Sequence, residues 1–250
     1  MGSIRVDIRD DGVAVITLDH PTKPVNTLTP ELVSEFRDTA VPVLDDDRVR
    51  AVVVTSAKPD TFIAGADLDV IEGLGAEEIS SMSREGNALL ERIASQAKPV
   101  VAAVHGAALG GGMVVAMACH YIIASNHPAT VFGQSEVQLG LLPAGGGTQR
   151  LVERAGLTAA LPLLLTGKRF RARKAKKLGV VDALTTPGGI TETACRAALA
   201  LADGRLKLVP KKLATADRAA RFEPARGFIL KKAREKTERQ TRGNYPAPMA

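Results

Sequence analysis

Continuous apolar runs alternate with amphipathic segments along most of the chain. Residues 49–56 (VRAVVVTS), 98–106 (KPVVAAVHG) and 120–125 (HYIIAS) are apolar runs of strand length. Such runs are typical of parallel strands that are buried on both faces. Amphipathic segments at 29–47 and 76–96 have helical periodicity instead. The alternation predicts an α/β fold with short strands and helical crossovers.

The first amphipathic segment carries the signals of a helix start. Thr29 is a residue type that caps helices, and Pro30 fits the first helical turn. Apolar residues from Leu32 to Ala40 then recur on one face. Upstream of this helix, two β-type runs flank the polar turn at Asp10–Gly12, which predicts a hairpin.

The second half of the chain is mainly helical in pattern. Further helices are expected at 111–119, 145–156, 157–167, 171–179 and through much of 189–240. We therefore divide the chain into a core at 1–188 and a C-terminal helical region at 189–250. The last nine residues, RGNYPAPMA, contain prolines and resemble the start of a linker more than a docked terminus.

Composition limits the function classes. Aromatic residues make up 3% of the chain and Trp is absent, so the stacking platforms of a single-strand nucleic-acid binder are scarce. The net charge of +6 favours an anionic ligand without naming one. Cys119 and Cys195 are too few for a disulfide framework and lie in apolar runs, which predicts buried thiols in a reducing cytoplasm.

We identify no secretory or membrane-spanning segment in the sequence. The N-terminus has no apolar stretch of the secretory type. The longest apolar run, Pro99–Ala124, approaches membrane-spanning length, but His105, His120 and a glycine triplet interrupt it. We expect a cytoplasmic protein without a membrane segment.

Two strand ends carry clusters of small residues. The segments are Ile63–Asp67 (IAGAD) and Ala108–Gly112 (ALGGG). Free backbone amides at a helix N-terminus favour negative charge, and two such termini facing one point would form an oxyanion hole. Alternatively, the glycines only permit close packing of strand on helix.

Other glycine, nucleophile and metal motifs do not fit. The chain has no P-loop, no dinucleotide-binding G-x-G-x-x-G and no G-x-S-x-G nucleophile elbow. Its four histidines show no metal-ligand spacing. We therefore expect neither a metal nor a separate cofactor.

Glu136 lies in VFGQSEVQLGLLPAGGG, a segment with no other charge. A carboxyl group in apolar surroundings has a raised pKa and can carry a proton at neutral pH. The alternative is a capping or surface glutamate. A second charged feature, the run Lys168–Lys177, carries seven basic residues and is either a solvated helix face or a ligand site.

These segments together resemble the crotonase superfamily, the enoyl-CoA hydratase/isomerase group. The similarity covers nearly the whole chain in order and is carried by these motifs: FIAGADL, KPVVAAVHGAALGGG, FGQSEVQLGLLPAGGGTQRL, LLLTGKRFRARKAKKLGVVD and REKTERQTRGNYPAP. The last motif resembles the hydratase part of multifunctional fatty-acid oxidation α subunits. We expect either a stand-alone relative or a part of such a protein.

The resemblance implies a spiral of repeated ββα turns followed by a helical C-terminal region. It implies an acyl-CoA thioester substrate of fatty-acid β-oxidation, with coenzyme A present only as part of the substrate. It also implies a homotrimer or a hexamer. Neither a nucleic acid nor a membrane partner is expected.

Residue roles also follow from the resemblance. The amides of Ala66 and Gly111 would form the oxyanion hole, and Glu136 matches the family's second catalytic glutamate. The remaining expected substrate contacts are Lys58, Ala64, Gly65, Asp67, Leu68, Gly110, Val114 and Pro143, with Lys58 as a phosphate contact and the adenine and pantetheine along 64–68.

Two positions depart from the family pattern. Val114 stands where a GGG-x-E pattern would place the first glutamate, and Ala144 replaces a glycine that commonly follows Pro143. Because valine cannot hold a water or move a proton, we expect hydration to be weakened by about 10²–10⁴-fold. The alternatives are a single-glutamate isomerase of 3-enoyl thioesters and a catalytically poor acyl-CoA-binding or assembly protein.

Overall fold

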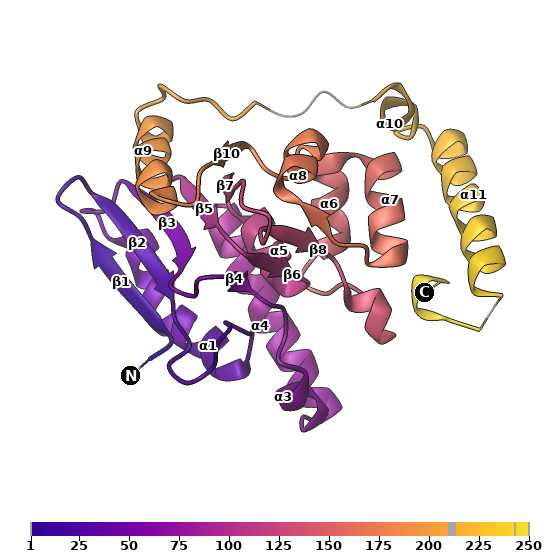
Figure 1. The fold of residues 1–250 in the computed structure, drawn as a ribbon, viewed down its shortest axis with the longest axis horizontal. Helices are drawn as coiled ribbons and strands as arrows, with labels where there is room; N and C mark the ends of the chain where they lie inside the picture. The colour runs from indigo at the N-terminus through magenta and orange to yellow at the C-terminus, as the bar shows by residue number, and fades with distance from the viewer. Residues whose placement is uncertain (1, 210–213, 243, 250) are drawn as a thin grey trace.

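The computed structural model describes residues 2–209, 214–242 and 244–249, and its strands form two sheets (Figure 1). The strands of the larger sheet, in spatial order, are β1 (Ile4–Ile8), β2 (Val13–Leu18), β3 (Ala51–Ser56), β5 (Val100–Val104), β7 (Tyr121–Ser125) and β10 (Ala183–Thr185). The strands of the smaller sheet are β4 (Thr61–Ile63), β6 (Ala107–Leu109), β8 (Val131–Gly133) and β9 (Phe170–Arg171). Only the β1–β2 and β8–β9 pairs are antiparallel.

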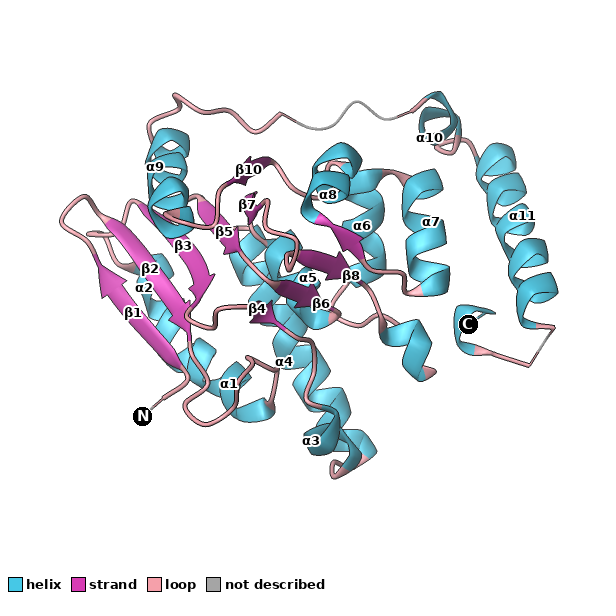
Figure 2. Ribbon diagram, viewed as in Figure 1, coloured by secondary structure: helices cyan, strands magenta, loops and turns pink. Residues whose placement is uncertain are grey.

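The helices follow the strands in a regular order (Figure 2). Those before β7 are α1 (Pro30–Glu35), the π-helix η1 (Phe36–Ala40), α2 (Val41–Asp45), α3 (Leu68–Glu72), α4 (Ala76–Ala94) and α5 (Gly111–Ala118). Those after β8 are η2 (Glu136–Leu139), α6 (Gly147–Ala155), α7 (Leu157–Thr166), α8 (Ala172–Leu178), α9 (Ile190–Ala202), α10 (Thr215–Ala219), α11 (Glu223–Thr241) and η3 (Ala247–Met249).

The predicted ββα spiral is confirmed by the way the chain visits the two sheets. Three times in succession it runs through one strand of the larger sheet, then one strand of the smaller sheet, then a helical segment. These turns are β3–β4–α3–α4, β5–β6–α5 and β7–β8–η2–α6. Each turn therefore leaves the end of a short strand next to the start of a helix or helical turn.

The central strands β3 and β5 of the larger sheet are buried on both faces, as their continuous apolar sequences predict. Alternate β3 residues point to opposite sides: Val52 and Val54 pack in the cluster that includes Leu90 of α4. Ala51 and Val53 pack in a second cluster with Ala194 of α9. The sheet thus lies between α4 and α9.

The local predictions also hold at the first helix and at the cysteines. The Leu32 amide donates a hydrogen bond of 3.2 Å to the Thr29 hydroxyl, and Pro30 begins α1. Both cysteines are buried free thiols, and burial raises the pKa of Cys119 to about 12. Neither thiol is therefore a ready nucleophile at neutral pH.

α10, α11 and η3 of the C-terminal region contact the core at α7. Asp217 of α10 accepts hydrogen bonds from the amide and hydroxyl of Thr158, at 2.8 and 2.9 Å. The expectation of an undocked tail is wrong for the described part: Tyr245 is hydrogen-bonded to η2, and Ala247 is buried. None of the helices in the described ranges is both long and apolar enough to cross a membrane.

Candidate active site

The two clusters of small residues lie side by side because their strands are neighbours. β4 and β6 pair in parallel, with Thr61 opposite Ala107 and Ile63 opposite Ala108. Beyond the paired residues, the chain continues into 64–67 on one side and into 109–112 on the other. The β4–β6 pairing therefore brings together the two segments that the sequence singles out.

Close packing of α5 on β4 explains why residue 112 is a glycine. A Cβ at Gly112 would lie 2.3 Å from the carbonyl oxygen of Ile63, a separation at which the backbone would have to move. At Gly110 the constraint is conformational, since its φ of +50° is one that side chains disfavour. The packing interpretation of the glycines is thus correct for Gly112, and it leaves the amides available.

Two backbone N–H groups at this junction have no acceptor among the described residues. Leu28 forms a bridge to the 64–67 loop: its amide donates to the Gly65 carbonyl, and its carbonyl accepts from the Asp67 amide. In such a parallel bridge the N–H of Ala66 points away from Leu28. Gly111 is the first residue of α5, where an N–H has no intrahelical acceptor.

Glu136 lies against the same glycines. It begins η2, the turn that follows β8, and a Cβ at Gly110 would lie 3.2 Å from its Oε1 atom. The side chain is partly buried, and the loss of solvent raises the pKa of its carboxyl group. Gln134 is 1% exposed, and its amide nitrogen, oriented toward the carboxylate, donates to Oε1 at 3.0 Å and to Oε2 at 3.2 Å.

Sequence comparison matches a recognised family over most of this fold. The profile of the family Enoyl-CoA hydratase/isomerase aligns with residues 9–225. The chain belongs to this family. The Idiomarina loihiensis fatty acid oxidation complex subunit alpha is 41% identical over 243 residues, which is 97% of this chain. The chain spans 34% of the length of that relative.

Solved structures of the family share the fold. An enoyl-CoA hydratase from Bacillus anthracis superposes with a TM-score of 0.76 at 28% identity, covering 94% of this chain and 90% of the other. DspI from Pseudomonas aeruginosa gives 0.75 at 29% identity, covering 94% of each chain. The expected spiral of ββα turns is therefore confirmed both by topology and by superposition.

Val114, which the sequence analysis identifies as a departure from the expected family pattern, is 1% exposed. Cβ atoms placed at Gly145 and Gly147 would lie 3.2 and 3.0 Å from its methyl groups, and the Gly145 position also meets Leu90. A Cβ at Gly147 would lie 2.9 Å from the amide of Gln134. Val114 thus fills an apolar space that adjoins Gln134, the partner of Glu136.

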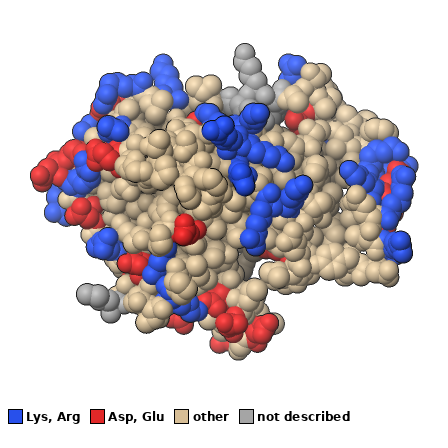
Figure 3. All heavy atoms as spheres, viewed as in Figure 1, with Lys and Arg blue, Asp and Glu red and all other residues tan. Residues whose placement is uncertain are grey.

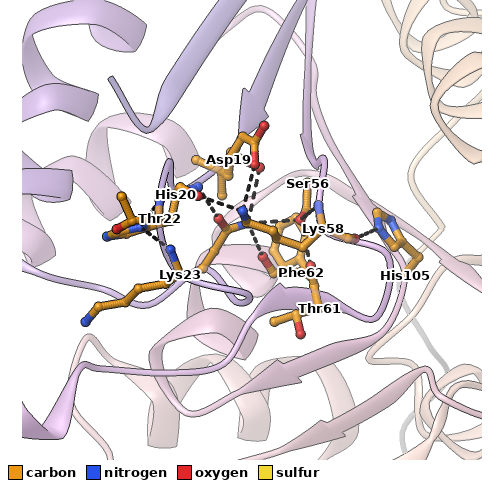
Figure 4. A network of polar contacts seen from close by, with 11 residues as sticks. Asp19, His20, Thr22, Lys23, Ser56, Lys58, Thr61, Phe62 and His105 are labelled. Carbon is orange, nitrogen blue, oxygen red and sulfur yellow. Dashed lines mark hydrogen bonds and ion pairs between the residues drawn. The ribbon is translucent and has the colours of Figure 1, made fainter. Parts of the chain in front are cut away.

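Lys58, the expected phosphate contact in this family member, is held by intramolecular partners (Figure 4). Its ammonium group forms an ion pair with Asp19 at 2.9 Å and donates to the His20 carbonyl at 2.6 Å. The side chain is only 15% exposed. A phosphate group would have to share or replace these contacts.

The Asp67 carboxylate is also already bonded to other residues of the chain. Its carboxylate accepts from the Lys23 ammonium and from the Thr27 hydroxyl, and these bonds hold its pKa below the ordinary value. Asp67 therefore ties the loop at 23–27 to the loop at 64–68. Its neighbours Ala66 and Leu68 are exposed, and Ala64 is half-buried.

The loop that contains Pro143 is on the surface. Pro143 is half-buried, Ala144 is exposed, and the loop closes onto α5 through the glycines at 145–147. Figure 3 shows basic side chains gathered over α8 and the adjoining end of the smaller sheet. In α8, Ala172 and Ala175 are buried while the run's lysines and arginines are exposed, which is the pattern of a solvated helix face.

Gln134 and Leu28 are the site residues that the sequence analysis did not identify. A glutamine directly after the apolar strand VFG carries a usable signal, since a buried amide requires a polar partner nearby. Leu28 carries none, because its role depends on backbone bonds. The described residues contain no cluster of three metal-ligating side chains.

Proposed function

We propose that this chain acts on acyl-CoA thioesters of the fatty-acid oxidation type and stabilises the enolate formed at the thioester carbonyl. The observation that carries the proposal is the pair of unpartnered amides, Ala66 and Gly111, on adjacent segments. Fixed backbone donors stabilise an oxyanion without reorganisation, and one such donor can contribute about 10²–10³-fold in rate. Family membership supports the same substrate class.

Glu136 is the proposed acid and base. Its carboxylate is adjacent to Gly110, one residue before the second amide, which supports a position beside the carbon next to a bound thioester carbonyl. Its raised pKa brings it nearer to neutrality, where a group both accepts and returns a proton efficiently. Gln134 orients the ionised carboxylate by donating to both oxygens.

Hydration of 2-enoyl-CoA is the activity that the family suggests, and we propose that it is weakened here. Adding water requires a group that holds the water and one that moves its proton. Val114 supplies neither and occupies the neighbouring space with methyl groups. The expected loss relative to a two-carboxylate site is about 10²–10⁴-fold.

Isomerisation of 3-enoyl-CoA to 2-enoyl-CoA is the second candidate, and the dry surroundings of Val114 favour it. Glu136 would remove a proton from the α carbon, giving a dienolate whose oxygen is held by the Ala66 and Gly111 amides. The same carboxyl group would return the proton at the γ carbon, and the double bond would shift into conjugation. No water is consumed, so the missing carboxylate has no direct role.

The coenzyme A part of the substrate is proposed to lie along residues 64–68, where Leu68 is exposed. Lys58 would contact a phosphate only by giving up part of its bonding to Asp19. The trimeric or hexameric assembly that the resemblance implies is a further prediction, and sedimentation analysis of the purified chain measures it.

The decisive experiment measures 2-enoyl-CoA hydration and 3-enoyl-CoA isomerisation side by side. Both activities should fall by at least about 10²-fold in Glu136→Gln, which keeps size and hydrogen bonding but not proton transfer. Acyl-CoA affinity, measured by calorimetry, should be retained. Tight binding with neither activity in the unaltered chain would replace this proposal with an acyl-CoA-binding role.

A further inference from the structure

The C-terminal segment reaches back to the turn that carries Glu136. The Gly140 amide donates a hydrogen bond of 2.8 Å to the Tyr245 hydroxyl. The same hydroxyl donates to the carbonyl of Val137. One side chain therefore bridges a donor and an acceptor at the end of η2, about a hundred residues away in sequence.

The turn is short, and the hydrogen bond that closes its last residues is long. η2 is a four-residue 3₁₀ helix that is capped by Gly140 in the left-handed conformation, with φ of +78°. Its Gly140 amide is 3.3 Å from the Val137 carbonyl, a long hydrogen bond. Leu139 and Leu141 are exposed, and Val137 supplies the buried apolar contact of the turn.

Glu136 is the first residue of this turn and depends on its backbone. The Leu141 amide donates to the Glu136 carbonyl at 3.0 Å, which closes the turn around the bonds made by Tyr245. On its other side, the Gln138 side chain donates to the Thr166 carbonyl at the end of α7. The turn is thus held between α7 and the C-terminal segment.

The C-terminal segment is itself anchored. Ala247, two residues after Tyr245, is 6% exposed. η3, which begins at Ala247, contacts both α7 and α11. The Tyr245 hydroxyl is therefore presented to the turn by a packed segment.

We propose that Tyr245 is a positioning residue that fixes the Glu136 carboxyl group by bracing the 136–140 turn. The inference rests on the proposed role of Glu136 as acid and base. Tyr245 does not touch the reacting atoms in this account; it acts through the backbone of Val137 and Gly140. Loss of the hydroxyl would loosen the turn and let Glu136 move toward solvent.

The test compares Tyr245→Phe with Tyr121→Phe. The first change removes only the bracing hydroxyl and keeps the ring. Tyr121, the other tyrosine of the chain, lies in β7, and its hydroxyl makes no hydrogen bond among the described residues, so its variant is a matched control. Thermal unfolding and circular dichroism establish that both variants are folded.

The expected results for Tyr245→Phe are a kcat lower by about 10-fold with KM changed by less than about twofold, since a displacement of 1 Å can cost about 10²-fold. Amide hydrogen exchange at Gly140 should be faster than in the unaltered chain. The acidic limb of the pH–rate profile should move to lower pH, because a more solvated Glu136 has a lower pKa. Tyr121→Phe should match the unaltered chain in all three.

An unchanged kcat and pH profile in folded Tyr245→Phe would overturn the proposal, even if Gly140 exchanged faster. Failure of the proposed function is a separate outcome, since it would appear as absent turnover in the unaltered chain. In that event Gly140 exchange and the NMR titration of Glu136 still decide whether Tyr245 positions that carboxyl group.

Discussion

Val114 has the clearest expected consequence of any single residue in this site, because it is buried beside the Gln134 amide and carries no group that can bond water. The predicted departure from the family pattern is therefore accompanied by apolar packing against Leu90 and the glycines at 145 and 147. On the proposed function, the residue at 114 determines whether a water is held at the site, while enolate stabilisation depends on the Ala66 and Gly111 amides.

The substitution Val114→Glu should raise hydration of 2-enoyl-CoA by about 10-fold or more, since it restores a second group able to orient water. The new carboxyl group would lie beside the Gln134 amide and share it with Glu136. Initial rates by absorbance measure the change, and Val114→Gln, which is polar but cannot transfer a proton, is the control. Equal rates in Val114→Glu and the unaltered chain would contradict the two-carboxylate argument.

Glu136 should also limit activity at low pH. As a base it must be ionised, and burial raises its pKa above the ordinary value of 4.5. Activity should therefore fall, as pH is lowered, at a higher pH than an exposed glutamate would give. A pH–rate profile with its acidic limb at or below the ordinary value would be inconsistent with a buried base.

The raised pKa of Glu136 also has a consequence for the stability of the folded protein. A raised folded-state pKa means that the folded protein binds the proton more tightly than the unfolded chain, so ionisation costs stability as pH rises through that pKa. Glu136→Gln removes this cost and should have a higher melting temperature than the unaltered chain at about pH 7, with the difference vanishing below about pH 4. A lower melting temperature at both pH values would show the carboxylate to be a structural partner instead.

At the scale of single elements, the long strands and helices could be predicted and the three-residue strands could not. The apolar runs that became β3 and β5, and the periodicity of α4, are strong signals. β4, β6 and β8 are too short for a pattern, yet their pairing aligns the two segments of the site. The residue roles came from the family resemblance, and the Gln134 and Tyr245 contacts came only from the folded chain.

The packing of β4 against α5 gives a test at this scale. Gly112→Ala should lower the free energy of unfolding by about 1–3 kcal/mol, because its Cβ would meet the Ile63 backbone at 2.3 Å. Gly86→Ala, within α4 and with nothing within 4 Å of the added Cβ, should instead stabilise by about 0.5–1 kcal/mol. Urea titrations measure the free energy of unfolding of both variants. An unchanged free energy in Gly112→Ala would contradict the close approach of α5 to the Ile63 backbone.

At the scale of the whole molecule, the C-terminal region is joined to the core at two different places. α9 covers one face of the larger sheet, and α10, α11 and η3 contact α7. The division at 188/189 remains a prediction. The position of α9 shows that the residues just after that boundary complete the core cluster on the outer face of the sheet.

Asp217 should contribute to stability as the link between α10 and α7. It is 7% exposed and accepts from the Thr158 amide in the first turn of α7, so its loss leaves a donor unpaired. Asp217→Ala should cost about 1–2 kcal/mol. Asp45→Ala, which removes an exposed partner of Arg92, is the control and should cost less than about 0.5 kcal/mol. Similar costs for the two would show that α10 is not held by this bond.

The central claim is that the Ala66 and Gly111 amides stabilise an enolate that Glu136 forms and quenches. Exchange of the α protons of a saturated acyl-CoA thioester in D₂O, followed by mass spectrometry, measures this step without water addition or double-bond movement. The account predicts deuterium incorporation with the unaltered chain and none above background with Glu136→Gln. No incorporation with the unaltered chain, in the presence of demonstrated thioester binding, would contradict it.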